Sequence, residues 1–172
     1  NNSLNFVDIF GKKIYSFYLD SNKLNFFTSK LTPGAVLPTN KDLLAITLED
    51  GLYTCDYFGE NLTSLFEIEK EIKTNRMNDA KCDSAGVLFA GTMGDGKSPS
   101  GSLYRISTSS YKKIRSNVVV SNGLAGEDST LLFITSASVE IDKFNGSSSR
   151  DGDLFIVDVG IVGIPTHQFQ LV

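Results

Sequence analysis

Short apolar runs recur along the chain at a nearly constant interval. The runs that begin at Leu4, Leu44, Leu88 and Leu132 start 40, 44 and 44 residues apart. Each is followed by a polar turn and a second run in which apolar and polar residues alternate, which is typical of half-buried strands. A unit of about 40–45 residues built from short strands is the period of a propeller blade. The apolar spacing of three and four that a helical solenoid requires is missing from these runs, so the pattern predicts an all-β fold.

We predict that residues 1–172 form a single partial β-propeller domain of about three and a half four-stranded blades. The blade-like units cover approximately residues 1–30, 35–73, 76–119 and 120–160. The remaining residues, 161–172, form a divergent tail that fits no repeat.

Length and composition narrow the function classes. The chain has 172 residues, enough for one domain with a real core, and its 41% hydrophobic and 21% charged residues are ordinary for a soluble globular protein. A net charge of −4 argues against a nucleic-acid partner, for which clustered Lys and Arg are expected.

The longest apolar run, Leu154–Pro165, is too short to span a membrane, and no signal peptide is visible. We therefore expect a cytoplasmic protein with no membrane partner. Cys55 and Cys82 share no metal-binding spacing, which favours reduced, apolar side chains.

The central stretch of the chain, Asn75–Met93, carries a cluster of polar side chains. Arg76, Asn78 and Asp79 precede a turn at Ser84–Gly86 and a short apolar strand. A cation, an amide and a carboxylate ahead of a buried strand suit a binding site at the mouth of a sheet. The alternative is a solvated loop with a side-chain turn at Asn78, because polar loops usually bind only water.

A run of mixed charge lies just before this stretch. It contains Glu67, Glu69, Lys70, Glu71 and Lys73. Runs of this kind usually belong to solvated strand ends or loops, and we interpret it in that way.

The segment Gly91–Ser98 matches the pattern of a nucleotide-binding P-loop, and Leu154–Asp158 resembles the apolar strand whose Asp holds magnesium. A P-loop requires a helix that begins at its Gly-Lys-Ser, since the helix N-terminus helps to bind phosphate. Here Pro99–Gly101 follows, and then a β-patterned segment, Leu103–Ile106. Nucleotide binding is therefore the weakest of the function hypotheses.

Several motifs in order resemble the regucalcin, gluconolactonase and luciferin-regenerating enzyme family, which includes the senescence marker protein. They are Arg76-Met77-Asn78-Asp79, Cys82-Asp83, Gly91-Thr92-Met93, Gly101-Ser102-Leu103-Tyr104-Arg105 and Val120-Ser121-Asn122-Gly123-Leu124. The resemblance extends from about Leu4 to Leu132. It implies a propeller whose complete ring has six blades and a metal-dependent hydrolase that acts on sugar lactones with Ca²⁺ or Zn²⁺ as cofactor.

The resemblance also implies roles for individual residues. Arg76 would hold a substrate oxygen, and Asn78 would bond the substrate or a metal-bound water. Asn122 corresponds to one metal ligand of the family. A second ligand, a Glu in a Gly-Glu-Gly-Pro motif, precedes the first blade, and this chain starts after it. The third, an Asp that also suits the role of catalytic base, is replaced near Thr166, so we expect weak metal binding.

Two function hypotheses from different classes follow. The chain is a fragment or truncated relative of a metal-dependent lactonase, inactive in this form, that takes a small lactone or sugar acid as ligand. The alternative is a non-catalytic binding or structural module.

We expect self-association or marginal stability, because three and a half blades leave unpaired strand edges that invite pairing with other chains. Size-exclusion chromatography with light scattering at several protein concentrations measures this directly. A sharp monomer at every concentration, with a cooperative melt at high temperature, would contradict the expectation.

Overall fold

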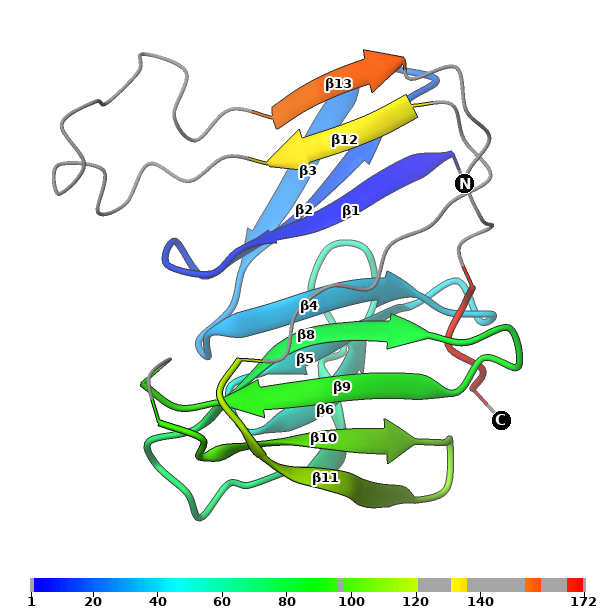
Figure 1. Ribbon diagram of the computed structural model, residues 1–172. Helices are drawn as coiled ribbons and strands as arrows, with labels where there is room; N and C mark the ends of the chain where they lie inside the picture. The colour runs from blue at the N-terminus through cyan, green and yellow to red at the C-terminus, as the bar shows by residue number, and fades with distance from the viewer. Residues whose placement is uncertain (1, 96–97, 121–130, 136–153, 159–166, 172) are drawn as a thin grey trace, which may run out of the picture. The chain divides into compact units, whose positions relative to one another are not determined.

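A computed structural model describes residues 2–95, 98–120, 131–135, 154–158 and 167–171, and every regular element in those residues is a β-strand (Figure 1). The prediction of an all-β fold is confirmed. The chain divides into two compact units, residues 1–124 with 167–172, and residues 125–166. In the described ranges, no helix has the length and apolarity needed to cross a membrane.

The described strands of the first unit form three antiparallel sheets, each with its strands in chain order (Figure 1). The first sheet contains β1 (Ser3–Asp8), β2 (Lys13–Tyr18) and β3 (Lys23–Thr28). The second contains β4 (Pro33–Pro38), β5 (Leu44–Leu48), β6 (Gly51–Cys55) and β7 (Thr63–Glu67). The third contains β8 (Arg76–Cys82), β9 (Leu88–Met93), β10 (Gly101–Ile106) and β11 (Tyr111–Val118). In the second unit, β12 (Leu131–Thr135) pairs with β13 (Leu154–Asp158). The two four-stranded meanders are the blade that the sequence period predicts.

Within the second sheet, β4, β5 and β6 contribute to hydrophobic clusters on both faces, and all five residues of β5 are buried. Successive side chains of a strand point to opposite faces. Accordingly, Leu44, Ile46 and Leu48 belong to a hydrophobic cluster with Ile14 of the first sheet. Ala45 belongs to a second cluster, which includes residues of the third sheet such as Met77, Leu88 and Ile106. The core of the first unit thus lies in two layers, one on each side of the second sheet.

The C-terminal residues 167–171 add to this core. Phe169 is completely buried, and its N–H donates to the carbonyl of Pro38 over 3.0 Å. The N–H of Leu171 donates to the side-chain oxygen of Asn40 over 2.8 Å. The tail therefore has a packing role that its lack of a repeat pattern did not indicate.

The backbones of β4 and β8 approach closely at Gly34. β4 has a bulge at this glycine, and β8 has one between Met77 and Ala80. A Cβ at Gly34 would lie 2.3 Å from the carbonyl oxygen of Asn78 and 2.8 Å from that of Met77. Only glycine fits, because both obstacles are backbone atoms of the neighbouring strand.

Gly34→Ala is expected to destabilise the protein by about 1–3 kcal/mol, since the added methyl forces the two strands apart. Urea unfolding measures the change. Gly11→Ala is the matched control, because a Cβ there meets only the side chain of Asp8. If Gly34→Ala were as stable as Gly11→Ala, the backbone of β8 would move away from the added methyl at no cost in stability, contrary to this prediction.

Candidate site at the bulge of β8

The polar residues Arg76, Asn78 and Asp79 lie within β8, the first strand of the third sheet. The alternative interpretation of this segment as a solvated loop is therefore wrong: the segment is a strand of its own, and the short apolar strand expected after the turn is β9. The physical reason is that Met77 and Cys82 of the same segment are buried in the core, with exposed fractions of 0% and 4%. Their burial holds the segment in a strand despite its polar composition.

The bulge of β8 brings the two predicted substrate-binding residues together. Three residue steps on β8, from Met77 to Ala80, face two on β9, so one residue is extra. A bulge of this kind redirects a side chain and is common beside binding sites. The Nη1 of Arg76 donates to Oδ1 of Asn78 over 3.0 Å and to the carbonyl of Met77 over 2.9 Å. Arg76 and Asn78 are thus in direct contact, while their roles toward a substrate stay a prediction.

Arg76 is a half-buried cation. Burial lowers the pKa of its guanidinium below the ordinary value, and the nearby carboxylate of Glu49 acts in the opposite direction. An arginine stays protonated at neutral pH all the same. Its Nη2 lies 3.2 Å from the sulfur of Met93, a weak acceptor. These bonds do not use all the donors of the guanidinium, so Arg76 has the capacity to bind a ligand oxygen.

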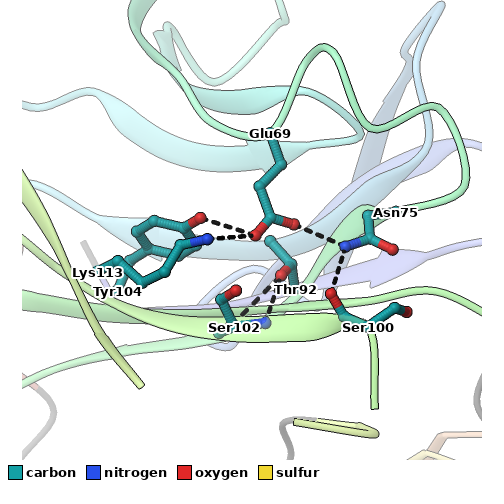
Figure 2. Close-up of polar contacts among 7 residues, drawn as sticks. All are labelled: Glu69, Asn75, Thr92, Ser100, Ser102, Tyr104 and Lys113. Carbon is teal, nitrogen blue, oxygen red and sulfur yellow. Dashed lines mark hydrogen bonds and ion pairs between the residues drawn. The ribbon is translucent and has the colours of Figure 1, made fainter. Parts of the chain in front are cut away.

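A second polar cluster is centred on Glu69, in the connection between β7 and β8 (Figure 2). The side chain of Glu69 is only 5% exposed. One carboxylate oxygen accepts from the hydroxyl of Tyr104 over 2.7 Å and lies 3.5 Å from the ammonium of Lys113. The other accepts from Nδ2 of Asn75 over 2.8 Å. The interpretation of the charge run as solvated is therefore wrong for Glu69, although the side chain of Glu67 is exposed.

The surroundings of Glu69 keep its carboxylate ionised. Burial alone raises the pKa of this group. Hydrogen bonds outweigh burial and bring the pKa below the ordinary 4.5, and they come from the side chains of Asn75, Tyr104, Ser102 and Thr92. Burial and the bond to Glu69 raise the pKa of the Tyr104 hydroxyl. At neutral pH, Glu69 is thus an acceptor and Tyr104 a donor.

Asn75 connects this cluster to the β9–β10 connection. The residue is 6% exposed, and its Nδ2 also donates to the carbonyl of Ser100 over 2.9 Å. Its Oδ1 is buried and has no hydrogen-bond partner in the described part of the chain. Neither Asn75 nor Glu69 is a predicted site residue. Tyr104 lies 35 residues further along the chain than Glu69, and Lys113 lies beyond it, so the sequence around Glu69 carries no signal of these contacts.

The P-loop pattern falls on a strand connection. Gly91–Met93 ends β9, and β10 begins at Gly101. Between them, Oδ1 of Asp95 accepts from the N–H of Ser98 over 2.7 Å. Gly96–Lys97 lies outside the described residues. No helix begins in the described part of this connection, so it lacks the feature on which phosphate binding by a P-loop depends.

The family resemblance implies a divalent cation that Asn122 would help to hold. Asn122 and Thr166 lie outside the described residues, so their implied roles stay predictions. Elsewhere, no group of three or more His, Cys, Asp or Glu side chains in the described part is arranged to hold a metal ion. Cys55 and Cys82 are free and buried, as predicted, and burial raises the pKa of each thiol to about 12. At neutral pH these thiols are protonated and therefore weak nucleophiles.

Two cavities border the first unit's sheets. One, of about 450 Å³, lies between the first and second sheets and is lined mainly by apolar side chains, including Ile14, Phe27 and Ile46. The other, of about 120 Å³, is polar and is lined by residues that include Glu49, Glu69 and Asn75. Arg76 lines neither of these two cavities.

Residues 1–154 match the family described as the SMP-30/Gluconolactonase/LRE-like region. The chain is 32% identical over 151 residues to a putative sugar lactone lactonase, YvrE, of Bacillus subtilis, and this covers 84% of the chain and 51% of that protein. It is 30% identical over 154 residues to regucalcin of Sus scrofa, covering 84% of the chain and 52% of that protein. The chain thus spans about half the length of these curated relatives.

Two solved structures are similar in fold. One is a calcium-binding protein, regucalcin, of Agrobacterium tumefaciens, with a TM-score of 0.67 and 22% identity over 77% of this chain and 45% of that one. The other is a luciferin-regenerating enzyme, with a TM-score of 0.67 and 20% identity over 98% of this chain and 73% of that one. Together with the four-stranded meanders, these similarities confirm the prediction of a partial propeller.

The lowered pKa of Glu69 makes stability depend on pH. Its folded pKa lies below the ordinary 4.5, so the unfolded chain binds the proton more readily, and stability rises with pH through this region. The hydroxyl of Tyr104, whose pKa is raised, stays protonated there. We expect Glu69→Gln to cost about 1 kcal/mol at neutral pH, the difference between a charged and a neutral acceptor.

As the pH falls below 4.5, the free energies of unfolding of wild type and Glu69→Gln should converge. Chemical denaturation at a series of pH values measures both. If the difference in free energy of unfolding between wild type and Glu69→Gln stayed constant down to the pH at which the protein unfolds, Glu69 would not be ionised in the folded protein.

Proposed function

This chain belongs to the SMP-30/gluconolactonase/LRE-like family, and from that membership we propose that it supplies the lactone-binding side of a sugar-lactone hydrolase site. The observation that carries the proposal is the contact between Arg76 and Asn78 at the bulge of β8. It sets a partly desolvated cation and an amide side by side. Both residues belong to the motif that resembles the family's substrate-binding pair.

The chemistry of a sugar lactone suits this pair. A lactone presents a carbonyl, a ring oxygen and hydroxyl groups, all of which accept hydrogen bonds. The guanidinium of Arg76 has donors left after its bonds to Met77, Asn78 and Met93. Hydrolysis places negative charge first on the carbonyl oxygen and then on the product carboxylate. A half-buried cation stabilises such charge more strongly than an exposed one, because less water competes with it.

The role of Asn78 in the proposal is to hold and orient. Its side chain is 7% exposed, and its Oδ1 accepts from Arg76. A buried amide that fixes a guanidinium limits the directions in which the remaining donors point. The pair therefore binds a ligand oxygen in one geometry rather than several, which is how positioned groups favour a reaction.

No step of this proposal passes through a metal ion. The Ca²⁺ or Zn²⁺ that the resemblance implies needs several ligands, and the described residues bring no three His, Cys, Asp or Glu side chains together to hold it. The action of this chain's own residues is to bind the lactone and to stabilise charge on its oxygens. The alternative function, a non-catalytic binding module, uses the same two residues without turnover.

Arg76→Met is expected to weaken binding of gluconate, the product of gluconolactone hydrolysis, at least tenfold, because it removes the charge and the donors but keeps a long apolar side chain. NMR titration, followed through the side-chain amide signals of Asn78, measures the affinity. Arg105→Met is the matched control, since Arg105 is exposed on β10. An affinity unchanged in Arg76→Met, or no binding by wild type, would refute the proposal.

A lactonase assay with gluconolactone and a pH indicator separates the two functions. Turnover above buffer that is lost in Arg76→Met supports the hydrolase. Binding without turnover supports the binding module.

A further inference from the structure

We infer that Glu69 is a positioning residue for Arg76, acting through Asn75 on the first residue of β8. The part of this inference that concerns a ligand rests on the proposed function. The part that concerns the position of Arg76 stands on contacts of the described residues alone.

Glu69 joins elements that are separate in the chain. Its carboxylate contacts Tyr104 of β10 and Lys113 of β11, while its backbone belongs to the β7–β8 connection (Figure 2). Its carbonyl accepts from the N–H of Ile72 over 2.8 Å, and the carbonyl of Ile72 accepts from the N–H of Asn75 over 2.9 Å. The connection thus folds back so that Asn75 meets the carboxylate of Glu69. Contacts at both ends of this connection fix the point at which β8 starts.

The backbone of Glu69 supports this view. Its φ is 55°, in the left-handed region that residues other than glycine, asparagine and aspartate seldom adopt. A residue held in such a conformation needs surrounding contacts that determine it. The bonds of the Glu69 side chain supply them.

Asn75 transmits the position of Glu69 to Arg76. The two residues are consecutive and their side chains have different partners: Asn75 contacts Glu69 and Ser100, whereas Arg76 contacts Asn78 and Met93. Along an extended chain, successive side chains point to opposite faces. Holding the side chain of Asn75 therefore directs that of Arg76 toward the bulge.

The same contacts control both ends of the β9–β10 connection. Met93 is the last residue of β9 and contacts Arg76, while Ser100 immediately precedes β10 and accepts from Asn75. The connection between them is therefore attached to the start of β8 at two points. A change at Glu69 reaches the surroundings of Arg76 by both routes.

The orientation of the Asn75 amide depends on Glu69. Its Nδ2 donates to two acceptors, Glu69 and Ser100, while its Oδ1 is buried without a partner in the described part of the chain. A rotated amide would set Oδ1 against both acceptors. A buried oxygen left without a bond is unfavourable, so the two acceptors must compensate for it. Without the acceptor at position 69, the amide loses one of the two hydrogen bonds that favour this orientation.

The test compares Glu69→Met with Glu69→Gln. Both side chains have the length of glutamate, but only Gln retains an oxygen that accepts from Asn75. A role in packing alone would make the two variants alike, or Met the better of them. Glu67→Met is the matched control, because Glu67 lies two residues away with a 57% exposed side chain. The readouts are the NMR signals of the Arg76 Nε–H and the Asn78 side-chain amide, and the affinity for gluconate.

We expect Glu69→Met to shift the Arg76 and Asn78 signals, to speed exchange of the Arg76 Nε–H at least tenfold, and to weaken gluconate binding at least fivefold. Glu69→Gln and Glu67→Met should stay within twofold of wild type. If Glu69→Met fails to fold, Asn75→Ala decides, since it breaks the link but leaves Glu69 its contacts with Tyr104 and Lys113. The inference would be overturned if the Arg76 signals were the same as in wild type in Glu69→Met or, where that variant does not fold, in Asn75→Ala.

The signals of the ligand-free protein separate the two proposals. A wild type that does not bind gluconate counts against the proposed function. Shifted Arg76 signals in Glu69→Met would still establish the positioning role in that case.

Discussion

β4, β5 and β6 each contribute residues to both hydrophobic layers, so none of these three strands can slip by one residue without exchanging the two layers. This constraint fixes the register of β4 and with it the place of Gly34. Gly34 in turn sets how closely β8 approaches, because its missing side chain is what lets the carbonyl of Asn78 lie against β4. The bulge that carries Arg76 and Asn78 thus has a position determined by core packing rather than by its own polar residues.

The two charged groups near this bulge are held in opposite ways. Glu69 is 5% exposed, and contacts from three side chains compensate for the loss of hydration of its carboxylate. Arg76 is also partly desolvated, but it bonds a carbonyl, an amide oxygen and a sulfur, and no carboxylate lies within salt-bridge distance in the described part of the chain. The charge of Glu69 is compensated by its partners and stabilises the fold. The charge of Arg76 has only neutral partners among the described residues, so an anionic or oxygen-rich ligand can still gain a favourable electrostatic interaction with it.

The sequence predicted the strands well and the polar contacts poorly. Regular spacing of the apolar runs made the meanders predictable, because period-two burial is a local property. The polar segment at Arg76 was placed outside a strand, since its burial comes from neighbouring strands rather than from its own composition. The surroundings of Glu69 were hidden for the same reason, as Tyr104 lies 35 residues away in the chain. Phe169 completes a core formed by residues from Ala35 to Ile106, much earlier in the chain, and no repeat pattern reveals this.

The composition of β8 is itself an argument for function. Asn and Asp are poor strand formers, and a buried amide such as Asn78 lowers stability unless its hydrogen bonds are satisfied. An apolar residue at that position would fit the core with fewer demands. Sequences that break a local rule, and then provide hydrogen bonds to compensate, do so most often where a site requires it. The bulge, the buried amide and the half-buried guanidinium are three such departures within residues 76–80. They point to a binding site at β8 by physical reasoning that does not depend on the family resemblance.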